Sequence, residues 1–135
     1  MILIDTHIWV WLANQDSRLK PEYRQSLELE IQNAPLMVSD ISLWEIQTAV
    51  SNGGMILPMP LDEWFRIATN PSVINFQRIT PEVVVEINNL MPFHKDPADR
   101  IITATARILE VPLATHDRDI IKSNAVSIWQ PKAFD

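Results

Sequence analysis

Short apolar runs alternate along the chain with longer segments in which apolar residues recur at helical spacing. A short, nearly continuous apolar run is typical of a buried strand, whereas a recurrence every three to four residues indicates one face of a helix. We expect strands or extended segments at Met1–Ile4, Leu36–Val38, Val73–Ile79, Val111–Thr115 and Val126–Trp129. We expect helices at Thr6–Ala13, Pro21–Asn33, Asp40–Ser51, Leu61–Thr69, Pro81–Asn89 and Pro97–Glu110.

Residues at the ends of these segments support the boundaries. Pro21 and Pro97 suit the first turn of a helix, where a missing amide proton costs nothing. Ser39 is a suitable N-cap for the helix that starts at Asp40. The only two glycines of the chain, Gly53 and Gly54, are adjacent and indicate a sharp turn after that helix.

The order of the elements predicts an α/β fold. Short apolar strands separated by helices usually form a mainly parallel sheet, here within a single domain over 1–135. Ligands of such sheets bind beyond the carboxyl ends of the strands. Asp5 and Asp117 both follow predicted strands, Glu45 lies in the helix after the second strand, and Asp99 lies in the first turn of a later helix. We therefore expect four acids, from four separate segments, to lie near the carboxyl ends of the strands.

Composition limits the class of protein. A chain of 135 residues with 47% hydrophobic residues is expected to bury a sizeable core. The absence of cysteine excludes disulfides and cysteine-based zinc sites. The apolar start lacks a basic region and is interrupted by Asp5, and no run reaches the length of a membrane span. We therefore expect a cytoplasmic protein without a membrane segment.

The net charge of −6 argues against a protein that binds nucleic acid through a generally basic surface. It fits a protein that gathers carboxylates around divalent cations, or one that has a basic partner. A local rim of basic residues can still contact phosphates, and bound cations cancel part of the negative field.

Each candidate acid also has a structural interpretation. Asp5 suits a helix N-cap as well as a site, and the two are evenly balanced. Glu45 stands among apolar residues, so it needs a partner, which a metal ion would supply. Asp96 precedes Pro97 and is more readily explained as an N-cap, which places Asp99 at the third helical position, the better candidate for the site.

The fourth acid is less well defined, because Asp117 and Asp119 both follow the strand Val111–Thr115. We favour Asp117, which lies closer to the end of the strand. Clustered carboxylates repel one another, and a divalent cation removes that penalty. Mg²⁺ and Mn²⁺ prefer oxygen ligands, and in pairs they catalyse phosphodiester hydrolysis.

Four sequence blocks resemble those of PIN-domain toxins of the VapC type. The resemblance extends over the whole chain, as far as Val126–Trp129, and its strength lies in the order and spacing of the blocks. The blocks are Leu3–His7, Val38–Ile46, His94–Arg100 and Leu113–Asp117.

The resemblance implies a PIN-like three-layer α/β/α fold and a Mg²⁺- or Mn²⁺-dependent endoribonuclease. It also implies a homodimer and a cognate antitoxin protein. The metal-binding and catalytic carboxylates would be Asp5, Glu45 and Asp99, with Asp117 at a position that is Asp or Asn among relatives. Thr6, Thr115 and Asp96 would support them. The chain departs from its subgroup at Phe93, where histidine is usual, and at Ala98, where phenylalanine is usual.

Basic residues beside the acids are candidates for contacts with RNA phosphates. They are Arg100, Lys95, Arg118 and His94. Arg107 and Lys122 are more readily explained as ordinary solvated charges. His7, His94 and His116 each adjoin a proposed acid, but an oxygen-rich Mg²⁺ site does not need imidazole. We expect His7 to cap or pack against the first helix.

The five tryptophans, of which none stands in a basic run, are expected in the core or in a dimer interface rather than as platforms for bases. Two alternatives to the ribonuclease remain. One is a PIN-like module that binds RNA or a partner with little catalysis, although the complete acid set counts against it. The other is a phosphatase-like hydrolase with Asp5 as nucleophile, a class that usually has a second Asp where this chain has His7.

Overall fold

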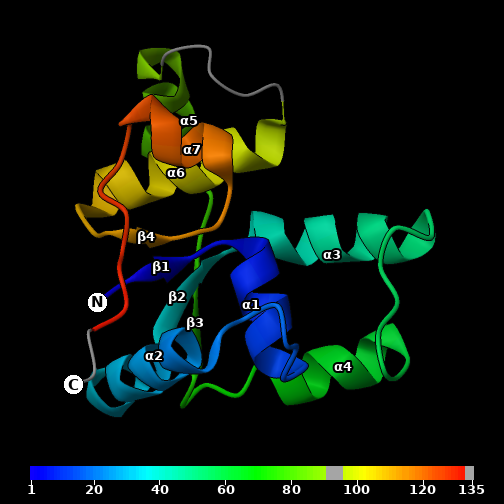
Figure 1. The fold of residues 1–135 in the computed structure, drawn as a ribbon. Helices are drawn as coiled ribbons and strands as arrows, with labels where there is room; N and C mark the ends of the chain where they lie inside the picture. Colours follow the sequence, from blue (N-terminus) through cyan, green and yellow to red (C-terminus); the bar gives the residue numbers. More distant parts are fainter. Residues whose placement is uncertain (91–95, 133–135) are drawn as a thin grey trace.

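A four-stranded sheet lies between two layers of helices in the computed structural model, which describes residues 1–90 and 96–132 (Figure 1). The strand order is β3-β2-β1-β4, and every pairing between the strands is parallel. The strands are β1 (Leu3–Ile4), β2 (Leu36–Ser39), β3 (Ile74–Gln77) and β4 (Leu113–Ala114). The predicted α/β class with a mainly parallel sheet is confirmed.

Helices cover both faces of this sheet. In Figure 1, α1, α2 and α4 lie on one side, α5, α6 and α7 lie on the other, and α3 extends outward from the end of β2. The helices are α1 (Thr6–Ala13), α2 (Pro21–Asn33), α3 (Ile41–Ser51), α4 (Leu61–Ala68), α5 (Pro81–Glu86), α6 (Pro97–Leu109) and α7 (Arg118–Ser123), and a 3₁₀ turn (Ile87–Asn89) follows α5. The three-layer arrangement predicted from the sequence is confirmed.

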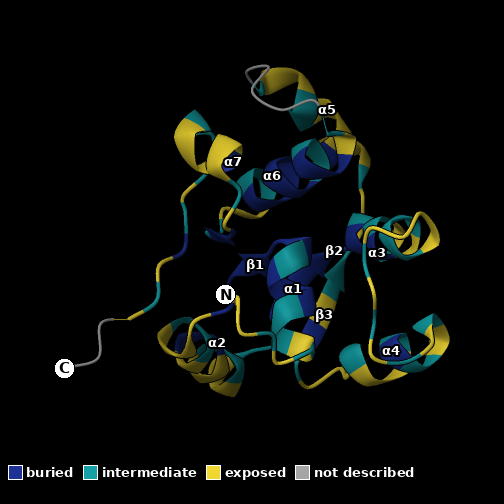
Figure 2. Cartoon of the chain, turned by 45° about the vertical axis from the view of Figure 1, so that its right-hand side comes forward, coloured by how far each residue is buried: buried dark blue, intermediate teal, exposed yellow. Residues whose placement is uncertain are grey.

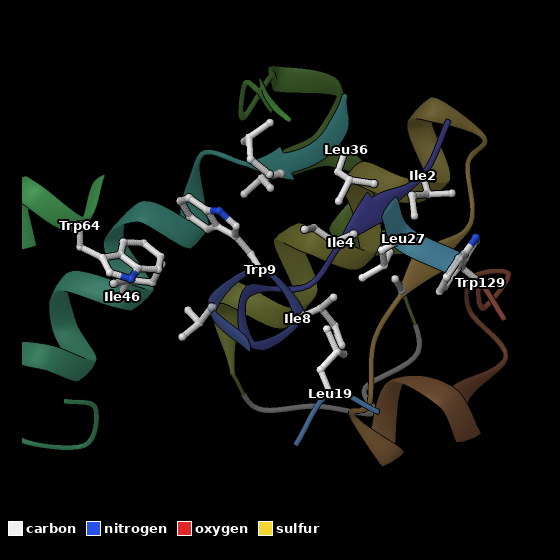
Figure 3. Packing of buried hydrophobic residues seen from close by; sticks show 14 residues of the cluster. Ile2, Ile4, Ile8, Trp9, Leu19, Leu27, Leu36, Ile46, Trp64 and Trp129 are labelled. Atoms are coloured by element: carbon white, nitrogen blue, oxygen red, sulfur yellow. The ribbon is translucent and has the colours of Figure 1, made fainter. Parts of the chain in front are cut away.

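Successive side chains of a strand point to opposite faces of the sheet, so the hydrophobic core has two parts, one on each face. Ile2 and Ile4 point to the side of α1 and α2, where they pack with Ile8, Trp9 and Leu27 (Figure 3). The residue between them, Leu3, packs on the opposite face with side chains of α6 and α7. Because both faces are covered, the strands β1, β2 and β4 are buried throughout, whereas the edge strand β3 is partly exposed, as its yellow segment in Figure 2 shows.

Local signals fix most of the boundaries. The observed α1 and α2 have the predicted bounds, and α6 begins at Pro97 with Asp96 as its N-cap, whose side chain accepts the amide proton of Ala98 at 2.9 Å.

No helix in the described ranges is long and apolar enough to cross a bilayer.

Three expectations were wrong in detail. The N-cap of α3 is Asp40 rather than Ser39, although the Ser39 hydroxyl accepts the Ile41 amide proton at 3.2 Å. The helix α7 was not expected, because its six residues show little periodicity and it depends on the packing of the fully buried Ile120. The predicted strand Val126–Trp129 forms only one isolated parallel bridge, between Leu113 and Ile128.

The bridge at Leu113 has no room to lengthen into a ladder. On one side, the Val111 amide donates to the Ala106 carbonyl at the end of α6, at 3.1 Å. On the other side, the chain turns after Thr115 into α7. The segment after α7 therefore passes beside β4 with two backbone hydrogen bonds, from Leu113 to Ser127 and from Trp129 to Leu113, each 2.9 Å long.

Candidate metal centre

Asp5 stands where β1 ends and α1 begins, at the carboxyl end of the paired strands β1 and β4. Its Oδ1 accepts the amide proton of Thr6 at 2.8 Å, so it does cap the helix. Its Oδ2 accepts a hydrogen bond of 2.7 Å from the hydroxyl of Thr115, which follows β4. Asp5 is only 2% exposed. The sequence left a cap and a site position as alternatives. The structure shows the cap, and the Thr115 hydroxyl holds the second oxygen.

Glu45 comes from α3 and is held by a relay of hydroxyl groups. Thr6 donates its hydroxyl proton to Glu45 Oε1 at 2.5 Å. The Ser42 oxygen lies 2.7 Å from the same Thr6 oxygen. Because Thr6 has only one hydroxyl proton, Ser42 must be the donor in that second bond. The fully buried Ser42 thus orients Thr6, which orients Glu45, and sequence analysis did not identify it.

Asp99 completes a group of three carboxylates. It lies in the first turn of α6 and is 8% exposed. One carboxylate oxygen from each of Asp5, Glu45 and Asp99 lies within 4.8 Å of the others. Among residues 1–90 and 96–132 this is the one group of three such side chains close enough to share a cation. The three acids come from three separate segments, as the predicted sheet edge required.

Asp117 lies beside this group rather than within it. It caps α7, since its Oδ1 accepts the amide proton of Ile120 at 3.0 Å. Its own amide donates to the Thr115 hydroxyl oxygen at 3.0 Å, so Thr115 links Asp117 to Asp5. The charge of Asp117 contributes to the electrostatics of Asp99. Asp119, the competing acid, is exposed.

The surroundings of Asp99 strongly raise its pKa. Burial, followed by the negative charges of Asp5, Asp96, Glu45 and Asp117, raises the pKa of Asp99 from 3.8 to about 8. Near neutral pH, Asp99 therefore retains a proton that a divalent cation would displace. The donor set consists of carboxylate oxygens, which is the chemistry that Mg²⁺ and Mn²⁺ select, so the residues present fit such an ion.

His7 lies beside the three carboxylates, and one of its two ring nitrogens is already hydrogen-bonded within the fold. Its Nδ1 lies 3.7 Å from Asp5 Oδ2, and its Nε2 accepts the amide proton of His116 at 2.9 Å. The second ring nitrogen is therefore used within the fold, in keeping with the packing role expected for His7. His116 is exposed, and partial desolvation of its ring with the charges of His7 and Lys20 lowers its pKa.

The basic residues divide into two kinds. Arg118 is exposed at the start of α7, and Arg100 is half-buried one residue after Asp99. Lys95 and His94, also expected to contact RNA, lie outside the described residues. Arg107 has a structural role, because its side chain donates to Glu86 Oε1 at 3.0 Å and to the Ala125 carbonyl at 2.8 Å.

Comparison with known proteins agrees with this geometry. Residues 2–125 match the model of the PIN domain. The chain is 30% identical over 133 residues to Ribonuclease VapC22 of Mycobacterium tuberculosis, an alignment that covers 95% of this chain and 98% of the relative.

Two solved structures share the fold at low sequence identity. A crystal structure of VapBC2 from Rickettsia felis, bound to a DNA fragment from its promoter, gives a TM-score of 0.75 at 18% identity and covers 98% of this chain and 100% of that one. A toxin–antitoxin complex from Klebsiella pneumoniae gives 0.63 at 22% identity, covering 99% of this chain and 100% of that one. With its fold, its acidic group and the family match over nearly its full length, the chain belongs to the PIN-domain family.

Proposed function

We propose that this protein is a metal-dependent endoribonuclease that hydrolyses RNA phosphodiester bonds. The observation that carries the proposal is the approach of three carboxylates, from β1, α3 and α6, to within 4.8 Å at the carboxyl end of the sheet. Ionising all three of these carboxyl groups together costs free energy unless a cation joins them. The similarity to Ribonuclease VapC22 supports RNA as the substrate.

The residues of the chain hold and orient the cation site. Asp5, Glu45 and Asp99 supply oxygen ligands for Mg²⁺ or Mn²⁺, and Asp117 stands beside them to accept hydrogen bonds from water or substrate. Thr115 fixes one oxygen of Asp5, and Thr6 fixes one oxygen of Glu45. A divalent cation at this position supplies Lewis acidity, which lowers the pKa of water and stabilises negative charge on phosphate oxygens.

The competing functions have less support. A module without catalysis has no need for a buried group of carboxylates, and here Asp5, Glu45 and Asp99 are all present and oriented. A hydrolase with Asp5 as its nucleophile belongs to a class that usually has a second Asp two residues later, where this chain has His7.

We further propose that the activity is that of a toxin controlled by a cognate antitoxin protein. Structural matches to toxin–antitoxin complexes support this assignment. The net charge of −6 and the acidic site favour an antitoxin segment with a basic side chain that enters the site. Exposed apolar side chains such as Ile56 (91% exposed) and Ile67 (59% exposed) offer a surface on which an antitoxin could pack. The same surface could instead contact a second copy of the chain in a homodimer. We propose that the protein acts in the cytoplasm.

Cleavage of a mixed RNA pool by the purified, antitoxin-free protein tests the nuclease assignment. We expect cleavage with Mg²⁺ or Mn²⁺, none with a chelator, and none with Asp5→Asn or Glu45→Gln, because each variant removes a charged ligand. Asp62→Asn, an exposed acid of α4, is the matched control and should cut like the wild type.

The outcomes separate the alternatives. Equal cleavage by all proteins, or cleavage that survives the chelator, would contradict the metal mechanism. Binding of RNA without cleavage by the wild type would favour the non-catalytic module.

A further inference from the structure

Three aromatic rings form a continuous cluster that leads outward from the acidic group. Its members are His7, Trp11 and His116, called here the ring cluster. The His7 and Trp11 ring centroids lie 5.1 Å apart, those of Trp11 and His116 5.5 Å, and those of His7 and His116 6.0 Å. Because His7 Nδ1 is 3.7 Å from Asp5 Oδ2, the cluster begins at the candidate metal centre.

The fold holds these rings in place from several elements. His7 and Trp11 are one turn apart on α1, so their side chains meet on the same face. His116 comes from the loop after β4, and its amide is bonded to His7 Nε2 at 2.9 Å. Tyr23 of α2 supports the His116 ring edge-on, with centroids 4.9 Å apart. The rings therefore form a fixed surface rather than three independent side chains.

The outer part of the cluster is exposed and is bordered by two basic side chains. His116 is exposed, and Trp11 and His7 are half-buried. The Arg18 guanidinium lies 5.1 Å from the centroid of the Trp11 ring. Lys20, exposed just before α2, is close enough to His116 for its charge to affect that ring. Two cations thus border an aromatic surface on a chain whose net charge is −6.

Arg18 is also paired with Asp16, but that pair leaves it able to bind a phosphate. The guanidinium donates from Nε and Nη2 to Asp16, with a shortest distance of 2.7 Å. The Arg18 side chain is 66% exposed, and pairs of this kind are held weakly in water. Arginine has further N–H groups on Nη1, which these bonds do not use.

Rings bordered by cations are what unpaired nucleotides bind. Bases of single-stranded RNA stack on aromatic and histidine rings and on guanidinium planes, while Arg and Lys contact the phosphates. We propose that His116, within the ring cluster, stacks a base of single-stranded RNA next to the scissile phosphodiester, with Arg18 and Lys20 on the neighbouring phosphates. The proposal rests on the ribonuclease function and specifies which side of the metal centre the RNA strand occupies.

The test measures binding of a short single-stranded RNA, cut by the wild type, to proteins that also carry Glu45→Gln and so leave it intact. His116→Ala should weaken binding about tenfold, because a lost base stack removes about that much affinity. His116→Phe keeps a ring without its nitrogens and should restore binding. In the cleaving protein, His116→Ala should raise KM while kcat stays near that of the wild type.

The salt dependence of RNA binding tests the role of Arg18 separately. Arg18→Gln should reduce the slope of log Kd against log salt by about 0.7, the value for one phosphate contact on a single strand, whereas His116→Ala should leave that slope unchanged. Arg66→Gln, an equal charge change at an exposed position on α4, should affect neither slope nor affinity.

Failure of this inference is distinguishable from failure of the proposed function. If the wild type cleaves RNA and His116→Ala binds it equally well, the stacking role is wrong and the ring cluster is left for a protein partner. If His116→Phe is as weak as His116→Ala, the imidazole nitrogens rather than stacking are responsible, which also overturns the proposal. If the wild type neither cuts nor binds RNA, the ribonuclease function itself fails, and this inference with it.

Discussion

The raised pKa of Asp99 predicts how the stability of the metal-free protein depends on pH. In the folded chain this carboxyl retains its proton up to about pH 8, whereas in the unfolded chain it loses it near its ordinary value of 3.8. Between these two values the folded state binds more protons than the unfolded state. The free energy of unfolding should therefore fall as the pH rises through this window and level off above about pH 8.

The structure sets the size of the effect. The shift spans about four pKa units, each worth about 1.4 kcal/mol, so the upper bound is about 6 kcal/mol. Because Asp99 remains 8% exposed, water screens part of this energy, and we take about half, or about 3 kcal/mol. For a chain of this length that corresponds to a change in Tm of about 10 °C.

Asp99→Asn removes the titrating group while keeping its shape. Thermal unfolding in a chelating buffer, measured from about pH 5 to about pH 9, should show a steep loss of stability for the wild type and a much flatter profile for Asp99→Asn. Saturating Mg²⁺ should restore the stability of the wild type at high pH, by about 2.7 kcal/mol at a hundredfold excess over Kd. Asp62→Asn, on the exposed face of α4, should follow the wild type. Parallel pH profiles for the wild type and Asp99→Asn would refute the reasoning.

Three further substitutions test the supports of the site. Thr115→Val removes the hydroxyl that donates to Asp5 and should lower the cleavage rate. It should also lower the free energy of unfolding, measured in urea, by about 1–3 kcal/mol. A variant with unchanged rate and stability would contradict the assigned hydrogen bond. Asp96→Ala removes the N-cap of α6 and should cost about 1 kcal/mol by the same measurement, with no loss expected if the cap is not formed. Tyr23→Phe removes a buried hydroxyl without a hydrogen-bond partner among the described residues, and should raise the Tm; a clear loss would show that the hydroxyl has a partner.

Elements with their own start and stop signals were predictable from the sequence. Asp96 followed by Pro97 identifies the start of α6, and Pro21 does the same for α2, because capping and first-turn preferences act locally. The short α7 and the single bridge at Ile128 were not predictable, since both depend on packing against distant segments.

The same division applies to the candidate site. The close approach of Asp5, Glu45 and Asp99 could be predicted because strand ends in a parallel sheet and first turns of helices meet at one edge. Ser42 was missed because its role depends on a hydroxyl of Thr6, and nothing in the local sequence distinguishes it from an ordinary helical serine. The contact of Trp11 with Arg18 likewise joins a helix to the loop that follows it, and no local sequence pattern indicates it.

The most direct test of the account is to locate the cation itself. Anomalous diffraction from crystals of the protein soaked in Mn²⁺ should show a peak within coordination distance of Asp5, Glu45 and Asp99, and the same experiment on Glu45→Gln should show a weaker peak or none. A fully occupied Mn²⁺ site elsewhere, with no peak among these three carboxylates, would contradict the central claim that they form the metal centre.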